Sequence, residues 1–101
     1  MSLKGNNVET IAAQQLGRLL PTRSLHLESL DLSENLLYDE GGRFIAEGLE
    51  KNESLKKLYM HCNSLEKAAG LAFKQAVERN RVILSLGLSD NHIDLSLLDE
   101  I

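Results

Sequence analysis

Residues 27–35 read LESLDLSEN, and two later stretches repeat their pattern: residues 55–63 read LKKLYMHCN and residues 83–91 read ILSLGLSDN. Each stretch starts 28 residues after the one before it. A period of this length is typical of arrays of stacked units, in which each unit contacts only its neighbours. The sequence therefore predicts a repeat protein, and this architecture favours binding over catalysis.

Each repeat is predicted to contain a short strand followed by a helix. Leu30 and Leu32 alternate with polar residues at period two, as expected for a strand with one buried face. Gly41, Ile45 and Leu49 recur at four-residue spacing, as one stripe of an amphipathic helix does. The second repeat carries the same stripe at Ala69, Phe73 and Val77.

An asparagine closes each predicted strand. Its side chain is expected to bond backbone groups of the following turn and of the neighbouring repeat, because a buried turn would otherwise leave donors and acceptors unpaired. The predicted asparagine ladder consists of Asn6, Asn35, Asn63 and Asn91. Asn52 and Asn80 follow the helical stripes, where a residue in the left-handed conformation commonly ends a helix.

The N-terminal region matches the repeat in part. Leu3, Asn6 and Val8 match the first full repeat at an offset of 29 residues, and Pro21 marks the end of a preceding helix. The predicted buried stripe of that helix is Ala12, Leu16 and Leu20. We expect a single domain over residues 1–101, with a partial repeat at 1–26, full repeats at 27–54 and 55–82, and a terminal partial repeat or cap at 83–101.

The three stretches fit the pattern LxxLxLxxN, and Asp39-Glu40-Gly41 follows the first of them. In these features the chain resembles leucine-rich-repeat proteins of the ribonuclease-inhibitor-like class. The resemblance implies an α/β solenoid, a short horseshoe with a parallel β-sheet on its concave side and α-helices on its convex side. The class includes ribonuclease inhibitor, sensing domains of NOD-like receptors, tropomodulin-like actin cappers and Ran GTPase-activating proteins. Residues 94–101 depart from the pattern, which indicates either a different cap or a truncated repeat.

Charge and cysteine content limit the classes of function. The formal net charge is −4, from 11 Lys and Arg against 15 Asp and Glu, and no block of like charge occurs. This argues against nucleic-acid and membrane partners. The single cysteine, Cys62, has no partner for an intrachain disulfide, and no apolar run of signal-peptide length begins the chain. These features predict a cytoplasmic protein.

Arrays of the resembled class usually bind proteins through the concave strands. Equivalent residues of adjacent strands form columns about 4.8 Å apart. One column would hold Asp31, Tyr59 and Gly87, in which an exposed ring stands beside a gap, as at interface hot spots. The predicted partner-binding residues are Asp31, Lys57, Tyr59, His61 and Asp90. The other predicted solvent-facing residues are Lys4, Glu28, Ser29, Ser33, Glu34, Lys56, Ser85, Gly87 and Ser89, with Glu28 and Lys56 forming a lateral ion pair.

Catalytic and metal chemistry have little support in the sequence. His61 and Cys62 are adjacent, but neighbouring residues of an extended segment point apart. We expect Cys62 to be partly packed at the strand end. The three histidines fall at different repeat positions, so they cannot converge on a metal ion. Nucleotide-binding and hydrolase motifs are missing, so we expect no catalytic residues, no metal and no cofactor.

Two alternatives to a protein-binding module stay open. One is a GTPase-activating role, as in one branch of the resembled class. The other is an architectural segment of a larger solenoid or of a cytoskeletal or ciliary assembly. Solenoids need capped ends, and an uncovered strand edge favours self-association. We therefore expect any homo-oligomer to form end to end.

Overall fold

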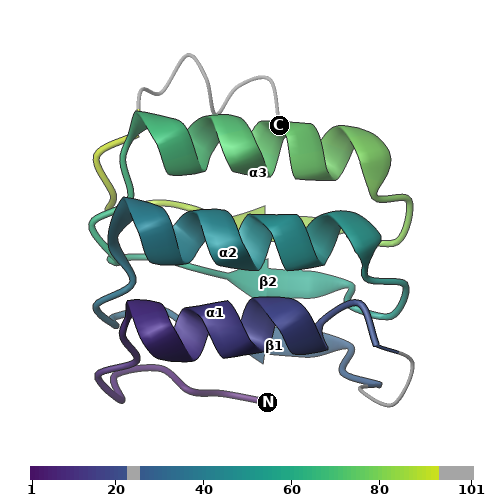
Figure 1. Cartoon of the computed structure of the whole chain (residues 1–101), viewed down its shortest axis with the longest axis horizontal. Helices are drawn as coiled ribbons and strands as arrows, with labels where there is room; N and C mark the ends of the chain where they lie inside the picture. The colour runs from purple at the N-terminus through teal and green to yellow at the C-terminus, as the bar shows by residue number, and fades with distance from the viewer. Residues whose placement is uncertain (23–25, 94–101) are drawn as a thin grey trace.

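The computed structural model describes residues 1–22 and 26–93, which form three helices and three strands in alternation (Figure 1). The expected cap at residues 94–101 lies outside the described residues. In chain order the elements are α1 (Thr10–Leu19), β1 (Ser29–Asp31), α2 (Tyr38–Lys51), β2 (Lys57–Tyr59), α3 (Lys67–Arg79) and β3 (Ser85–Gly87).

The strands form one parallel sheet in the order β1-β2-β3. Its register aligns Ser29 with Lys57 and Lys57 with Ser85, so residues 28 positions apart are lateral neighbours. This is the register that the sequence period predicts. Ahead of β1, Ser2 forms a further parallel bridge with Asp31. The N-terminal residues thus extend the row of strands.

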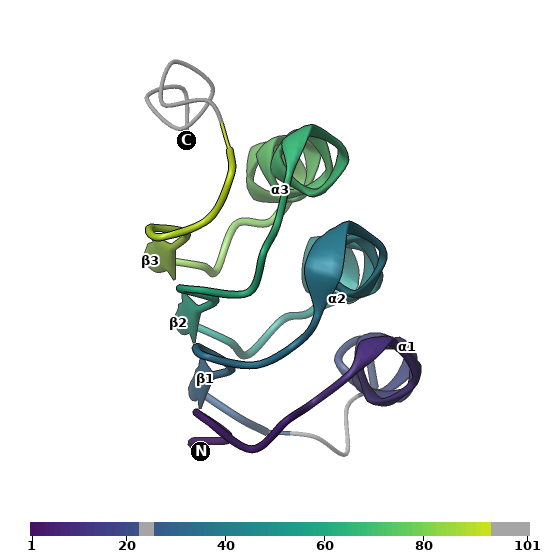
Figure 2. The same ribbon diagram turned by 90° about the vertical axis from the view of Figure 1, so that its left-hand side faces the viewer.

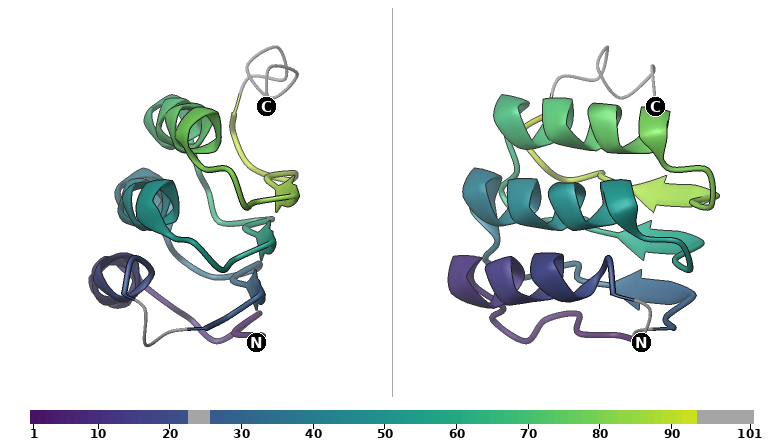
Figure 3. Two further views of the ribbon diagram at one scale, coloured as in Figure 1. Left: turned by 90° about the vertical axis from the view of Figure 1, so that its right-hand side faces the viewer. Right: turned by 45° about the vertical axis from the view of Figure 1, so that its right-hand side comes forward.

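All three helices lie on one face of the sheet (Figures 2 and 3). We call the opposite face, together with the residues that directly follow each strand on that side, the open face. No described helix or strand covers it (Figure 2). The open face comprises Lys4, Glu28, Ser29, Asp31, Glu34, Lys56, Lys57, Tyr59, His61, Ser85, Gly87, Ser89 and Asp90.

The core fills the space between the sheet and the helices. Leu30 and Leu58 point into it from the strands, and Ile45 and Phe73 meet them from α2 and α3, all fully buried. Leu30 and Leu58, like Ile45 and Phe73, are 28 residues apart and therefore occupy equivalent positions of the repeat. The arrangement confirms an α/β fold with a parallel sheet and helices on one side.

Two helical expectations are wrong in detail. In α1 the buried residue is Ala13, while Ala12 is exposed, because the first helix meets Gly41 through the Cβ atom of Ala13. At the helix ends, Asn52 and Asn80 have φ values of −73° and −81° and are extended rather than left-handed. These helices end differently from the predicted motif.

The two helix-ending asparagines form hydrogen bonds between repeats. Asn80 is buried, and its Nδ2 donates to the carbonyl oxygens of Leu49 and Asn52 at 2.6 and 3.0 Å. Its Oδ1 accepts the N–H groups of Val82 and Ile83. Asn52 bonds its own turn and the preceding repeat in the same way. Each asparagine therefore satisfies both the helix end before it and the turn that leads to the next strand.

Candidate interaction face

The strand-ending asparagines hold the turns beside the open face. Oδ1 of Asn35 accepts the N–H groups of Asn6 and Val8, both at 2.9 Å. The N–H of Asn35 donates to Oδ1 of Asn63 at 3.2 Å, and the N–H of Asn63 donates to Oδ1 of Asn91 at 2.7 Å. Asn6 is exposed, and its own side chain bonds the carbonyl of Lys4. Within the described chain, every buried side-chain nitrogen and oxygen has a hydrogen-bond partner.

A second set of hydrogen bonds runs across the open face from one repeat to the next. Oδ1 of Asp31 accepts the N–H of Ser33 at 2.9 Å. Oγ of Ser33 accepts the N–H of His61 at 3.0 Å, and Nδ1 of His61 accepts the N–H of Ser89 at 3.0 Å. Each acceptor satisfies a backbone donor just past a strand end. The open face is therefore a fixed scaffold rather than a row of free polar side chains.

This chain of bonds corrects the prediction for Ser33. The alternation pattern placed its side chain in solvent, but only 3% of Ser33 is exposed. The strand ends at Asp31, so the simple alternation stops applying two residues later. Ser33 therefore holds the backbone of His61 through a hydrogen bond and is too buried to contact a partner.

Two rings lie side by side on the open face. The rings of Tyr59 and His61 have centroids 6.0 Å apart and an interplanar angle of 17°. Gly87 makes room for both: a Cβ atom there would lie 2.5 Å from Cε1 of His61 and 3.0 Å from Cδ1 of Tyr59. The sequence predicted an exposed Tyr59 ring beside a gap at Gly87. In the structure the rings of Tyr59 and His61 occupy the space that the missing side chain of Gly87 leaves open.

The charges of the face are partly paired. Lys56 approaches Glu28 at 3.6 Å, as expected from the columns, and Lys4 approaches Glu34 at 4.0 Å. Both pairs are exposed, so each stabilises the fold by no more than about 1 kcal/mol. Among the described residues, the remaining charged positions of the face are Asp31, Lys57 and Asp90, of which Lys57 and Asp90 are exposed and Asp31 half-buried.

Asp31 is held in its ionised form. Partial burial acts to raise its pKa, but hydrogen bonds from the backbone and hydroxyl of Ser33 and the charges of Lys4 and His61 together lower the pKa below the ordinary value. The open face therefore carries a carboxylate of fixed position beside the Tyr59 ring.

Cys62 differs from its prediction. It is exposed rather than packed, and its φ is 56°, in the left-handed region. Glu34 and Asp90 occupy the same repeat position with φ values of 57° and 58°. The turn after each strand requires this conformation, which carries the side chain outward. In the described part of the chain no three His, Cys, Asp or Glu side chains gather as a metal site.

One exposed residue at the edge of the face was missed. Leu84 is 79% exposed, and its N–H donates to the carbonyl of Lys56 at 2.8 Å. It therefore extends the column of Glu28 and Lys56. The 28-residue period could have identified Leu84, because this period aligns Leu84 with Glu28 and Lys56.

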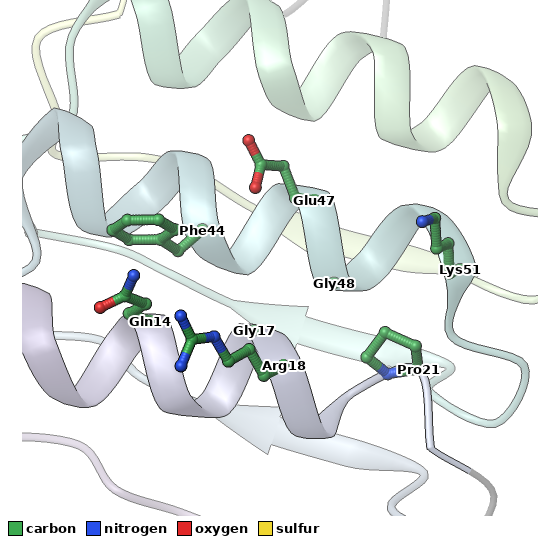
Figure 4. Close-up of a pocket in the computed structure, with 8 residues that line it drawn as sticks. All are labelled: Gln14, Gly17, Arg18, Pro21, Phe44, Glu47, Gly48 and Lys51. Carbon is green, nitrogen blue, oxygen red and sulfur yellow. The ribbon is translucent and has the colours of Figure 1, made fainter.

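The helix side has shallow hollows. One, of about 310 Å³, lies between α1 and α2 (Figure 4). Gln14 and Arg18 extend from α1 toward α2, whereas Glu47 points away from α1. A second hollow of about 340 Å³ lies between α2 and α3, where Arg79 also bonds Glu50 at 2.5 Å. Neither hollow brings convergent polar groups to one point, so the open face is the stronger candidate for a site.

Two curated proteins resemble the chain in sequence. It is 39% identical over 72 residues to NACHT, LRR and PYD domains-containing protein 5 of Homo sapiens, a match that takes in 70% of this chain and 6% of that protein. It is 34% identical over 81 residues to leucine-rich repeat-containing protein 45 of Gallus gallus, which takes in 78% of this chain and 12% of that protein. No protein-family model matches.

Both names refer to leucine-rich repeats, so the chain is related to leucine-rich-repeat proteins. It spans only about a tenth of the length of these curated relatives. Within residues 1–22 and 26–93, no helix is both long and apolar enough to cross a bilayer.

Proposed function

We propose that this chain is a non-catalytic leucine-rich-repeat module of the ribonuclease-inhibitor-like class that binds a protein partner through its open face. The parallel register at a 28-residue offset and the asparagine bonds between repeats support a solenoid segment. The relatives support the repeat family. In the horseshoe implied by the resemblance, the open face corresponds to the concave side.

The pair of rings above Gly87 is the observation that carries the proposal. Tyr59 and His61 present aromatic surface in the middle of a face that no described element covers. Aromatic residues surrounded by polar ones are typical of the energetically dominant part of interfaces. Asp31 and Lys57 stand directly beside Tyr59, one across the strands and one along β2, and Asp90 follows β3. These residues supply the polar rim of the proposed interface.

The surroundings of His61 favour binding over nucleophilic catalysis. Its Nδ1 already accepts the N–H of Ser89, and the exposed thiol of Cys62 lies on the adjacent turn. No group in the described part of the chain orients the imidazole toward that thiol.

A GTPase-activating role would require a polar side chain presented to another active site. The described arginines lie on helices or on the loop at Arg81, and Arg79 is bonded to Glu50, so no observation favours that role.

We also propose a domain organisation, a cellular compartment and a mode of self-association for the chain. Residues 1–101 would form one unit of stacked repeats in the cytoplasm, where a lone exposed cysteine is stable as a thiol. Any homo-oligomer would form end to end, because strand edges pair more readily than a face of fixed polar groups. Sedimentation over a concentration series tests this: assembly that persists when the open face is altered supports it, and assembly that depends on Tyr59 contradicts it.

The main test compares the proteins captured by three forms of the chain. Wild type, Tyr59→Ala and the helix-side control Glu47→Gln are immobilised after circular dichroism has shown equal folding. We expect a partner that wild type and Glu47→Gln retain and Tyr59→Ala loses, with direct binding then confirmed by the purified partner. Equal capture by all three forms would contradict open-face binding.

A further inference from the structure

The open face has an uneven charge distribution once its ion pairs are removed. Lys4 is beside Glu34 and Lys56 is beside Glu28. Asp31 and Asp90 make no ion pair with a described residue, and neither does Lys57. The two free carboxylates belong to the ends of β1 and β3, whereas Lys57 is at the start of β2. The strand-end half of the face is therefore acidic.

Asp31 is the fixed carboxylate of that half. It pairs laterally with Tyr59 in the sheet register, and its Oδ1 is held by the N–H of Ser33 at 2.9 Å. Partial burial acts to raise the pKa of this half-buried side chain, but the bonds from Ser33 and the nearby charges lower it, so Asp31 keeps its charge at neutral pH. A charge of known position thus stands beside the face of an aromatic ring.

The neighbouring histidine is held in place by Ser89. Nδ1 of His61 accepts the N–H of Ser89 at 3.0 Å and also lies 2.6 Å from Oγ of Ser89. These contacts fix the imidazole beside the Tyr59 ring. Tyr59 and His61 together form a nearly parallel pair of rings over Gly87.

We propose that the open face recognises an arginine side chain of the protein partner, which pairs with Asp31 and stacks on Tyr59. This inference rests on the proposed function. A guanidinium is planar, pairs with a carboxylate through two hydrogen bonds and stacks on aromatic faces, whereas an ammonium lacks the plane. A partner carboxylate in the same place would be repelled by Asp31 and Asp90. Lys57 is two residues away along β2 and stands beside Ser29 and Ser85.

The test uses blocked tripeptides as probes of the full chain. Gly-Arg-Gly is compared with Gly-citrulline-Gly, which keeps the shape without the charge, and with Gly-Lys-Gly and Gly-Glu-Gly. Amide chemical shifts are followed by NMR at low salt, where charge interactions are least screened. Asp31→Asn removes the charge but keeps the oxygen that accepts the Ser33 N–H, and Glu47→Gln is the matched control on the helix side.

We expect saturable shifts at Tyr59 and Gly87 with the arginine peptide. The citrulline peptide and the Asp31→Asn variant should each weaken binding about tenfold, the scale of one charge-assisted contact. Glu47→Gln should leave it unchanged. Equal binding of the lysine peptide, an undiminished affinity in Asp31→Asn, or an absence of arginine-induced shifts on the open face would overturn the inference. Open-face shifts caused only by the glutamate peptide would overturn the arginine proposal but not the proposal that the open face binds a partner. The capture comparison tests partner binding separately, because it uses no peptide.

Discussion

The carboxylate of Asp39, in the first turn of α2, accepts the N–H of Ala69, in the first turn of α3, at 2.7 Å. The same Oδ1 accepts the N–H of Glu66 at 3.0 Å. Glu66, which directly precedes α3, does not cap this helix with its own side chain. The start of α3 therefore depends on the neighbouring repeat, and the aspartate of the Asp39-Glu40-Gly41 motif has a structural explanation.

Removing this cap should destabilise the chain. Asp39→Ala should lower the free energy of unfolding by about 1–2 kcal/mol, because two N–H groups at a helix start lose their acceptor. Asp39→Asn should cost less, since it keeps Oδ1. Urea unfolding of both variants is the measurement, with Glu40→Ala, an exposed neighbour, as the control. Equal stability of Asp39→Ala and Glu40→Ala would rule out the capping role.

The asparagine ladder should be most sensitive at its centre. Asn63 is 1% exposed, and its side chain bonds the carbonyl oxygens of Leu32 and His61 and the N–H of Asn35. Asn63→Ala should cost about 2–4 kcal/mol, because these buried backbone groups are left unpaired. Asn6→Ala, at an exposed position, should change stability by less than about 0.5 kcal/mol. Similar losses for both variants in urea unfolding would contradict this account.

The exposed cysteine should be replaceable by glycine with a gain in stability. Cys62 has a φ of 56°, and Gly5 occupies the equivalent position of the first repeat at 70°. Glycine adopts this region without the steric cost of a Cβ atom. Cys62→Gly should raise the free energy of unfolding by up to about 1 kcal/mol, whereas Cys62→Ala keeps the Cβ atom and should not. Thermal unfolding of the two variants separates these cases, and a lower midpoint for glycine than for alanine would refute the explanation.

The stabilising effect of Asp31 should depend on pH. Its pKa is lowered in the folded protein, because bonds from Ser33 and the charges of Lys4 and His61 outweigh partial burial. Its contribution is therefore fully present above the unfolded-state pKa of about 3.9 and is lost as pH falls through the lower folded value. Urea unfolding at pH 7, 5 and 3 should show Asp31→Asn less stable at pH 7 and 5, with a smaller difference at pH 3. A difference that stays constant down to pH 3 would contradict the assignment.

The sequence predicts the fold well because the repeat supplies its own alignment. The spacing from Ser29 to Lys57 is also the lateral register of β1 and β2, so a count of residues predicts a tertiary contact. The same count locates Leu84 beside Lys56. Periodicity thus reports which residues are neighbours across the sheet.

The conformation of the chain just after each strand could not be predicted in this way. Alternation fails at Ser33 because the strand has already ended, and at Cys62 because the turn is left-handed. The N–H of Ser89 bonded to Nδ1 of His61 is also invisible in the sequence, because Ser33 uses a hydroxyl at the equivalent position. The position of the His61 ring beside Tyr59 therefore becomes apparent only from the structure.

The most direct test of open-face binding is site-specific photocrosslinking to the captured partner. A benzoylphenylalanine replaces either Lys57, exposed on the open face, or Gln75, exposed on α3. We predict that the partner crosslinks from position 57 and not from position 75. Crosslinking from position 75 alone would contradict it and assign the interface to the helices.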